Sequence, residues 1–429
     1  MNTNFCKDKK NNIYNWQGKK LLILGATKLL TQVVECAHKY GAKVIVIDYY
    51  ENSPAKKIAD ESYLISTTDV DEICKLIKNK KIDGVLTGFM DSMLPYYKLI
   101  CEKSNLPCYI SNDEQLNFST QKQIFKEYLA KFDIPYIKDI KYDESIEFPV
   151  IVKPVDNSGA RGISICNNEM ELNVGIENSL KFSKNKKYLI EKYYNFKEIT
   201  VFYLFDNGNY QVTFVGDRHV IQIKDGFIKL PSGYTFPSRY TNAFLETLDK
   251  KFKSLFKKLE IKNGMMFIQC FVDNNEAIIP YEAGYRLTGS LEYILLDKIC
   301  DYNPLAMMIN FAFTGRMTKV DNELNKICPQ NVEKCYNVSC LCKPGVIKEI
   351  VGVDKLKKQN GIIDIFESYE KGDILPEDSW GKLSQIGIRI FIRPKNDVHL
   401  ELIYQKIKEN LKIIDTKGND MIINYKILP

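Results

Sequence analysis

Residues 19–48, KKLLILGATKLLTQVVECAHKYGAKVIVID, constrain the fold more than any other stretch of the chain. An apolar run, a turn at Gly25, an amphipathic segment and a second apolar run ending before Asp48 predict strand, helix and strand. Two strands joined through a helix pair in parallel, so this stretch predicts a βαβ unit. A helix near 70–78, a strand in KIDGVLTG, a helix over about 93–104 and a short strand in PCYI extend it to a doubly wound domain.

The turn at Gly25 does not predict a dinucleotide site. The G-x-G-x-x-G motif needs three glycines where the protein approaches the pyrophosphate, and only Gly25 is present here. An ordinary tight turn into a helix is the better interpretation of this residue.

The composition indicates a globular chain of two or three domains, with 429 residues that are 45% hydrophobic and 27% charged. The net charge of +6 comes from 60 basic and 54 acidic residues spread along the chain, which favours compositional bias over a nucleic-acid surface. The N-terminal residues lack an apolar segment of signal-peptide length, and no apolar run approaches the roughly 20 residues that span a bilayer. We therefore expect a cytoplasmic protein without nucleic-acid or membrane partners.

The twelve cysteines are scattered among apolar runs, which predicts a reduced protein. Cys328, Cys335, Cys340 and Cys342 form the one cluster, but they lack the paired C-x2-C spacing of a structural zinc site. Cys340 and Cys342 fit the buried face of a strand equally well.

The middle of the chain begins with a helix in STQKQIFKEYLAKFDIP, with Ser119 as its predicted N-cap and Pro135 beyond its end. Lys122 then lies in the first turn, where the helix dipole disfavours a cation by up to about 1 kcal/mol. A solvated lysine is one explanation, and a bound anion is the other.

From Phe148 onward the pattern changes to strands and hairpins, with turn signals at Asn207-Gly208 (type I′) and at Asp225-Gly226. One amphipathic helix interrupts them over 244–259, and its apolar stripe predicts a core face. The stripe consists of Phe244, Leu248, Phe252, Phe256 and Leu259. After about residue 315, IGIRIFIRP and MIINYKIL predict further strands.

The segment MFIQCFVDNNEAIIPYEAGYR predicts a hairpin that turns at Asn274-Asn275. This register pairs Gln269 with Pro280 and Phe267 with Glu282, so Gln269 and Glu282 become diagonal neighbours about 7–8 Å apart on one face. Their oxygens are hard donors of the kind that Mg²⁺ takes. Arg286 follows on the same face and can grip an anion through two N–H groups, although a surface ion pair with Glu282 remains the alternative.

The stretch FPVIVKPVDNSGARGI places Lys153 near the end of an apolar strand, before a loop of small residues that ends at Gly162. Lys153 can hold phosphate oxygens, and the loop can close over them with backbone N–H groups and Arg161. Together with the Gln269/Glu282 hairpin, these parts predict phosphoryl transfer from ATP.

In this order, the motifs resemble those of ATP-grasp proteins, similar to the branch with carbamoyl phosphate synthetase, biotin carboxylase and the L-amino acid ligases. The resemblance covers nearly the whole chain and implies ATP and Mg²⁺ (one or two ions, with Mn²⁺ as a substitute). It implies a nucleotide site built from Lys122, Lys153, Ser158, Gly159, Arg161, Gly162, Glu191, Lys192, Tyr193, Glu198 and Arg218. In YLIEKYYNFKEITV, backbone groups near Glu191 to Tyr193 would hold adenine and Glu198 the ribose.

The resemblance also implies metal binding by Gln269 and Glu282, with Arg286, Glu282 and Lys153 in catalysis. Gly284 stands where the family usually has Asn, which puts the second metal ion in doubt. Asp91, Tyr285 and Thr288 are candidates for substrate contact, although Asp91 fits a core or capping role equally well. Beside Arg218, His219 is expected to be structural.

The fold expected from the resemblance is α/β: a Rossmann-like domain over 1–112, an ATP-grasp domain over 113–315 with its lid at about 148–205, and a C-terminal α/β domain over 316–429. The function expected is an ADP-releasing carboxylate–amine ligase that forms an acyl phosphate from a small acid and couples it to an amine. A bicarbonate-activating or carbamoyl-phosphate-type enzyme and a non-catalytic ATP-binding protein are the alternatives, and a homodimer is possible.

Overall fold

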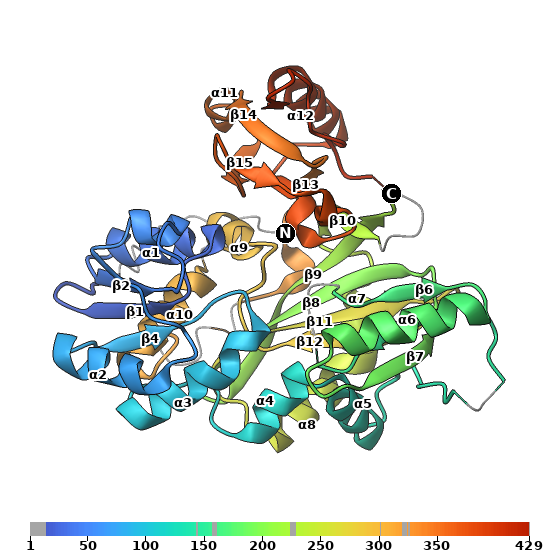
Figure 1. The fold of residues 1–429 in the computed structure, drawn as a ribbon, viewed down its shortest axis with the longest axis horizontal. Helices are drawn as coiled ribbons and strands as arrows, with labels where there is room; N and C mark the ends of the chain where they lie inside the picture. Colours follow the sequence, from blue (N-terminus) through green and yellow to red (C-terminus); the bar gives the residue numbers. More distant parts are fainter. Residues whose placement is uncertain are drawn as a thin grey trace, which may run out of the picture. The chain divides into compact units, whose positions relative to one another are not determined.

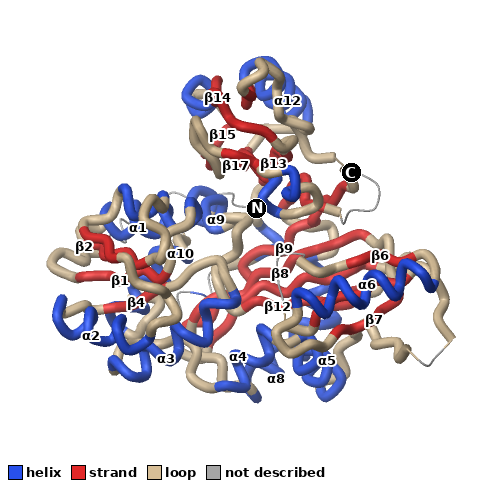
Figure 2. The backbone as a smooth tube through the Cα atoms, viewed as in Figure 1, coloured by secondary structure: helices blue, strands red, loops and turns tan. Residues whose placement is uncertain are grey.

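The computed structural model describes residues 14–428, apart from 143–144, 157–160, 224–228, 301, 320–323 and 325–326. It is a mixed α/β structure with parallel and antiparallel sheets, as the sequence predicts (Figures 1 and 2). The chain divides into two compact units. The first contains the residues up to Gly88 together with Pro95–Cys108 and Leu305–Thr318, and the second contains Phe89–Leu94, Tyr109–Pro304 and Lys319–Pro429.

The first unit is built on a four-stranded parallel sheet in the order β3-β2-β1-β4, which confirms the predicted βαβ unit. Its elements are β1 (Lys20–Leu24), α1 (Thr31–Lys39), β2 (Lys43–Ile47), β3 (Glu61–Tyr63), α2 (Val70–Lys80), β4 (Gly84–Leu86), most of α3 (Leu94–Ser104) and α10 (Pro304–Thr314). The predicted strand in PCYI is wrong, because residues 107–110 form no strand.

The turn after β1 is held by the end of β2. Gly25 has φ +95° and donates its N–H to Ile47 O at 2.9 Å, while Ala26 N–H donates to Asp48 Oδ2 at 3.0 Å. Because both residues have structural partners, the interpretation of Gly25 as an ordinary tight turn fits the structure.

The second unit is built on an eight-stranded antiparallel sheet in the order β12-β11-β8-β9-β10-β13-β17-β15. Its strands are β8 (Lys197–Asp206), β9 (Asn209–Ile221), β10 (Leu230–Phe236), β11 (Gly264–Val272), β12 (Ile278–Gly284), β13 (Cys335–Leu341), β15 (Ile362–Glu367) and β17 (Ile386–Ile392). The β8–β9 turn has positive φ at Asn207 (+48°) and Gly208 (+83°), as the type I′ signal predicts. The turn predicted at Asp225-Gly226 lies outside the described residues.

A small antiparallel sheet, β6-β5-β7, carries the lysine strand, and α6 packs on it (Figure 1). These elements are β5 (Val150–Pro154), β6 (Ser164–Cys166), α6 (Glu169–Phe182) and β7 (Tyr188–Lys192). They are preceded by α4 (Asp113–Thr120) and α5 (Lys122–Lys131). The predicted N-cap is wrong, because Ser119 lies in the last turn of α4 and donates to Gln115 O, while Gln121 precedes α5.

The predicted helix over 244–259 is present as α7 (Thr241–Phe244), a π-helical turn η4 (Leu245–Asp249) and α8 (Lys250–Lys258). The five stripe residues are all buried, as predicted. Four-residue spacing drifts around a 3.6-residue helix, and the wider π turn reduces this drift.

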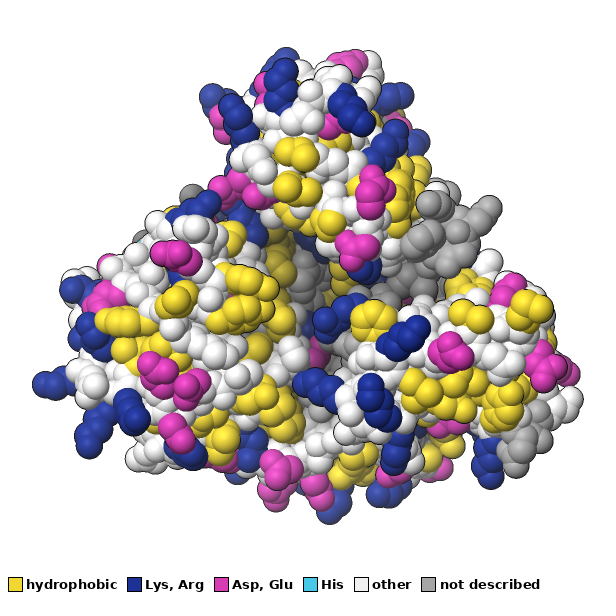
Figure 3. All heavy atoms as spheres, in the orientation of Figure 1, with side chains coloured by type: hydrophobic (Ala, Val, Ile, Leu, Met, Phe, Trp, Pro, Cys, Tyr) yellow, Lys and Arg dark blue, Asp and Glu magenta, His cyan; other side chains and the backbone are white. Residues whose placement is uncertain are grey.

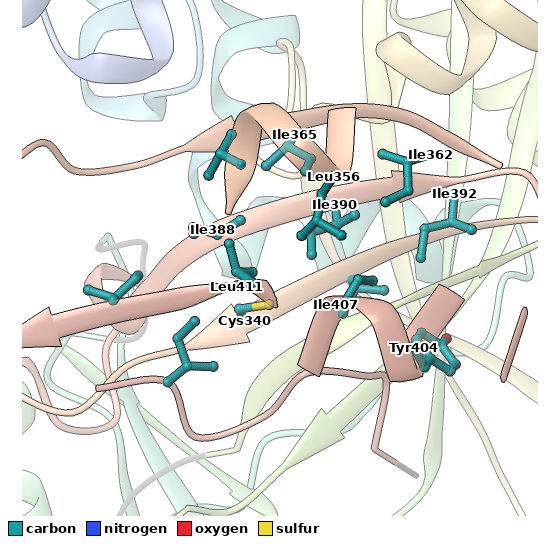
Figure 4. Close-up of a cluster of buried hydrophobic side chains, with 14 of the residues drawn as sticks. Cys340, Leu356, Ile362, Ile365, Ile388, Ile390, Ile392, Tyr404, Ile407 and Leu411 are labelled. Atoms are coloured by element: carbon teal, nitrogen blue, oxygen red, sulfur yellow. The ribbon is translucent and has the colours of Figure 1, made fainter. Parts of the chain in front are cut away.

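The C-terminal elements are α9 (Tyr293–Ile299), β14 (Gly345–Val351), α11 (Val353–Lys357), β16 (Ile374–Leu375), α12 (Asp397–Asn410) and β18 (Lys412–Asp415). Strands β13, β15 and β17 share a core with α11 and α12, where Ile388, Ile390 and Ile407 pack together (Figure 4). Cys340 and Cys342 are buried in this core, as the strand interpretation predicts. The predicted strand in IGIRIFIRP is β17, whereas MIINYKIL is wrong as a strand.

The surface in Figure 3 shows Lys and Arg side chains interspersed with Asp and Glu side chains. Within the described part of the chain, every helix is too short or too polar to cross a bilayer.

Candidate functional site

Lys153 lies in β5 with its side chain buried, and it is neutralised by Glu191 on the neighbouring strand β7. Its Nζ is 2.7 Å from Glu191 Oε2, while Lys126 of α5 bonds Glu191 Oε1 and also Asp139. Burial alone would raise the pKa of Glu191, but Lys153 and Lys126 together hold it below its ordinary value. Two cations and one shared carboxylate therefore form a buried network with one net positive charge before Asp139 is counted.

Lys122 is the half-buried first residue of α5. Its ammonium group interacts electrostatically with other predicted site residues. Burial lowers the pKa of Lys122, the carboxylate of Glu282 opposes this shift, and the ammonium of Lys153 adds to it. Charges interact this strongly only at short range inside a protein. The structure therefore brings Lys122, Lys153 and Glu282 into one electrostatic field.

The residues on either side of the glycine loop after Lys153 bond to the last turn of α6 and to the residues that follow this helix. Asp156 accepts from Ser183 Oγ and from Asn185 N, both at 2.8 Å, before the loop. Gly162 follows it with φ +77°, and its carbonyl accepts from Ser179 Oγ at 2.7 Å. Arg161 is exposed at the end of the loop, whereas the predicted phosphate contacts Ser158 and Gly159 lie outside the described residues.

The β11–β12 hairpin has a different register from the predicted one. Its loop spans 273–277, because Val272 pairs with Ile278, and a bulge after Gln269 shifts the register once more. Gln269 is therefore directly opposite Glu282 rather than diagonal to it. Both side chains are half-buried, and two adjacent hard oxygen donors fit one Mg²⁺ that keeps phosphate and water ligands.

Gly284 lies directly opposite Phe267 on the neighbouring strand. A Cβ at position 284 would lie 2.3 Å from Phe267 Cε1, closer than any real contact. The aromatic ring thus takes the space that a third donor at 284 would need. The same ring lies under the Arg286 guanidinium, with 5.1 Å from Cζ to its centroid.

Arg286 holds Asp91 through both prongs of its guanidinium. Nε and Nη2 donate to the two carboxylate oxygens of Asp91 at 2.7 Å each, and Nη1 donates to Leu287 O at 3.0 Å. The pKa of Arg286 stays above its ordinary value because the Asp91 charge outweighs burial. The predicted alternative, an ion pair of Arg286 with Glu282, is wrong, because the partner is Asp91.

Glu198 and Arg218 are direct cross-strand partners on β8 and β9, and their side chains form an ion pair. Tyr281 Oη donates to the same Glu198 oxygen, Oε2, at 2.8 Å, and no donor among the described residues bonds the other oxygen, Oε1. His219 bonds Thr235 Oγ1 at 2.9 Å, and burial lowers its pKa, as expected for a structural histidine.

The predicted adenine segment continues β7. Tyr193 N–H donates to Pro149 O at 3.1 Å, so its backbone donor is engaged within the protein. Lys192 Nζ donates to Glu147 O at 3.1 Å.

Two of the predicted substrate residues occupy buried positions. Tyr285 is fully buried and its hydroxyl donates toward Tyr109 O and Asn263 O, so its substrate contact stays a prediction beside this core role. Thr288 is buried and its hydroxyl contacts Ser290 and Glu292. Asp91 is half-buried and paired with Arg286.

Lys126, Tyr281 and Glu292 are not among the residues predicted from the sequence. Lys126 follows Lys122 by four residues, so both lie on one helix face, and this spacing is a signal that could have found it. Tyr281 and Glu292 gain their roles from long-range contacts, which leave no local pattern.

Family models match two parts of the chain. The model of the ATP-grasp domain matches residues 146–292, which contain β5, the glycine loop and the β11–β12 hairpin. The model described as the PylC-like N-terminal domain matches residues 21–105 in the parallel-sheet region.

Two curated relatives illustrate the extent of the similarity. The chain is 29% identical to the formate-dependent phosphoribosylglycinamide formyltransferase of Prochlorococcus marinus over 191 residues, which are 42% of this chain and 48% of that protein. It thus spans only about half of that relative. It is 26% identical to the N5-carboxyaminoimidazole ribonucleotide synthase of Staphylococcus aureus over 350 residues, 79% of this chain and 83% of that protein.

Solved structures share the whole fold. An L-amino acid ligase from Bacillus licheniformis matches with a TM-score of 0.73 and 19% identity, over 93% of this chain and 99% of that one. The biotin carboxylase domain of 2-oxoglutarate carboxylase from Hydrogenobacter thermophilus, solved with MgADP and bicarbonate, matches with a TM-score of 0.74 and 16% identity, over 92% and 90% of the two chains.

Proposed function

We propose that this chain, whose residues 146–292 match the family model of the ATP-grasp domain, is an ATP-dependent carboxylate–amine ligase. A small acid would be activated as an acyl phosphate and then coupled to an amine, with release of ADP and phosphate. The observation that carries the proposal is the electrostatic interaction of Lys122 with both Lys153 and Glu282. The three residues come from three separate elements, α5, β5 and β12.

The chemistry requires activation because a carboxylate is a delocalised anion that resists attack by an amine. Transfer of the γ-phosphoryl group to this carboxylate creates a good leaving group. In such transfers the protein contributes mainly position and charge neutralisation. No protein nucleophile is needed, which fits a site made of lysines, carboxylates and an arginine.

The chain's own residues divide these tasks. Lys122 and Lys153 would hold phosphate oxygens. Burial lowers the pKa of Lys122, and the negative charge of bound ATP would raise it again. Gln269 and Glu282 would hold one Mg²⁺, which neutralises phosphate charge when bound. The segment that follows Glu191 would take the base, and the bare Oε1 of Glu198 would accept from a ribose hydroxyl.

Arg286 would bind the acid substrate, but in this structure its Nε and Nη2 groups both donate to Asp91. We propose that the anion formed on the acid substrate replaces one oxygen of Asp91, while the ring of Phe267 keeps the guanidinium plane in place. Asp91 is then a positioning residue for Arg286.

The experiment is a screen for acid-dependent ADP release by the purified full chain, over pairs of small acids and amines with MgATP. Lys153→Ala should abolish the signal, because it removes the phosphate contact and one of the two lysines that neutralise Glu191. Lys181→Ala, at an exposed position of α6, is the matched control and should match the unmodified chain. Turnover that survives Lys153→Ala would overturn the assignment.

Bicarbonate is the second candidate for the activated acid. One relative that is similar over most of both chains is named an N5-carboxyaminoimidazole ribonucleotide synthase, and a carboxylated amine of that kind is what attack of an amine on activated bicarbonate would give. ADP release that bicarbonate stimulates, and that no other acid in the screen stimulates, would select this alternative.

A further inference from the structure

A buried polar cluster follows Arg286 in the chain, and the proposed ligase function gives its central residue no role. Its centre is Glu292, fully buried just before α9. Thr288 Oγ1 and Ser290 Oγ both donate to one oxygen, Oε2, the latter at 2.8 Å. The other oxygen, Oε1, is buried and has no hydrogen-bond partner among the described residues. The carboxylate is thus oriented through one oxygen and bare at the other.

The C-terminal strands contribute a second bare oxygen to the same cluster. Asn337 of β13 is fully buried, and its Nδ2 donates to Ser290 O at 2.6 Å. Its Oδ1 meets no donor in the part of the chain that the structure describes. Both side chains that carry a bare oxygen therefore bond to Ser290 through their other polar atom.

A buried cation lies beside these acceptors without pairing with them. Arg389 of β17 is 7% exposed, and Nη1 donates to Ser339 Oγ at 2.7 Å. Burial lowers its pKa to about 10, and burial raises the pKa of Glu292, although each charge partly offsets the shift of the other. No ion pair within 4.0 Å joins the two among the described residues, so their charges do not neutralise each other directly.

Buried polar groups in folded proteins are almost always hydrogen-bonded, so two bare oxygens on side chains that both bond to Ser290 require an explanation. A molecule that supplies N–H donors to the oxygens and an anionic group to Arg389 would satisfy all three groups. One ordered water could also supply two donors, but it would leave Arg389 uncompensated. Since Thr288 follows Arg286 by two residues, their Cα atoms are at most about 7 Å apart.

We propose that Glu292, Asn337 and Arg389 bind the amine substrate, a small zwitterion whose ammonium group meets the two bare oxygens and whose anionic group meets Arg389. This proposal rests on the ligase function proposed above. Glu292 is also placed to take a proton from the ammonium group. The freed lone pair of the nitrogen then forms the C–N bond while the acyl–oxygen bond breaks. Phosphate leaves with the electron pair of the broken bond and takes up the second proton that the nitrogen loses.

Binding is tested by calorimetric titration of the full chain, in the presence of MgATP, with free amino acids as zwitterions and with their amides and N-acetyl derivatives as controls. The zwitterions should bind at least tenfold more tightly than either derivative. Glu292→Gln should weaken zwitterion binding at least tenfold, because an amide N–H replaces part of the acceptor. Glu333→Gln, an exposed acid before β13, should leave binding unchanged.

Stability provides a readout that does not need the ligand. Glu292→Gln should not lower the melting temperature, because it removes a buried charge that lacks a full set of partners. A lower melting temperature with unchanged zwitterion binding would show a structural carboxylate and overturn the proposal. Equal, weak binding of all three compound classes would indicate an ordered water only, and would also overturn it.

Hydroxylamine separates this proposal from the ligase proposal, because it is a small neutral nucleophile that traps acyl phosphates without an ammonium site. In Glu292→Gln, acid-dependent hydroxamate formation should persist while amide formation falls at least tenfold. No acid-dependent ADP release by the unmodified chain would refute the ligase function itself. Normal hydroxamate and normal amide formation in the variant would refute the amine site alone.

Discussion

At the residue scale, the buried carboxylate of Glu191 decides how Lys153 is presented. One carboxylate serves two ammonium groups, Lys153 and Lys126, from different elements. Breaking a buried ion pair by removing one partner typically costs about 3–5 kcal/mol, because the other charge stays buried without compensation. Glu191 therefore stabilises the fold and positions the lysine that we assign to phosphate.

The lowered pKa of Glu191 predicts a pH dependence of its contribution to stability. A carboxyl group whose pKa is lowered by folding stabilises the folded state above its ordinary pKa, and this stabilisation is lost as pH falls through the lowered value. Glu191→Gln should reduce the free energy of unfolding by about 3 kcal/mol at pH 7. Below its ordinary pKa of 4.5, the difference from the unmodified chain should shrink.

The measurement is denaturant unfolding of the two proteins over a series of pH values. Glu177→Gln, at an exposed position of α6, is the control and should change stability little at any pH. A destabilisation by Glu191→Gln that is constant from pH 7 to pH 3 would show that the carboxylate charge is not what matters.

At the element scale, the β11–β12 hairpin shows how the connection fixes the chemistry of a face. Asp273 Oδ1 accepts from the backbone of Asn275 and Ala277, each at 2.8 Å, which closes a five-residue loop instead of a two-residue turn. The longer loop and the bulge after Gln269 move the pairing so that Gln269 faces Glu282 and Phe267 faces Gly284. Register thus sets both the oxygen pair and the aromatic partner of Arg286.

This register predicts that Gly284→Asn alone will not create a further metal ligand. The new Cβ would collide with the Phe267 ring, and overpacking of this kind costs about 1–3 kcal/mol. The double variant Phe267→Ala with Gly284→Asn has room for the amide, and it should bind more Mn²⁺ per chain in the presence of ATP than the single variant. Thermal unfolding and Mn²⁺ titration by electron paramagnetic resonance measure the two effects.

Phe267→Ala alone is the matched control, because it opens the space without adding a ligand and removes the ring under Arg286. Its Mn²⁺ stoichiometry should equal that of the unmodified chain. An undisturbed melting temperature in Gly284→Asn would show that Phe267 moves aside freely, contrary to the prediction.

At the scale of the whole molecule, the first unit is completed by a segment from far along the chain. Gly84, at the start of β4, lies so close to α10 that a Cβ would be 2.5 Å from Ala312 O. Trp16 donates to Asn310 Oδ1 at 3.3 Å and packs against Phe313. The expected domain boundaries at 112 and 315 stay a proposal, but residues 305–318 lie in the first unit.

Gly84→Ala should therefore destabilise the parallel-sheet unit by about 1–3 kcal/mol, because backbone rather than a flexible side chain must move. Gly88→Ala is the control, since its Cβ would meet only the end of Leu30 at 3.2 Å. Amide hydrogen exchange of the full chain measures the effect unit by unit. Equal protection of β1 in the two variants would contradict the close packing of α10 against β4.

The sequence by itself determined the parts whose signal is local. Alternating and helical apolar patterns predict the βαβ unit and the buried stripe of 244–259, because burial of one face sets the period of the pattern. The order of Lys122, Lys153, the glycine loop and the Gln269/Glu282 hairpin indicates an ATP-grasp domain, and the family model of that domain matches residues 146–292.

Only the tertiary structure decided which of these groups meet. The Glu191 network, the Asp91–Arg286 pair, the Glu292 cluster and the return of α10 to the first unit join residues that are distant in sequence. Such contacts depend on strand register and on chain crossovers, and a shift of one residue reverses the face to which a side chain points. Local sequence patterns do not specify the register or the crossovers. The partners of the charged side chains could therefore be identified only from the tertiary structure.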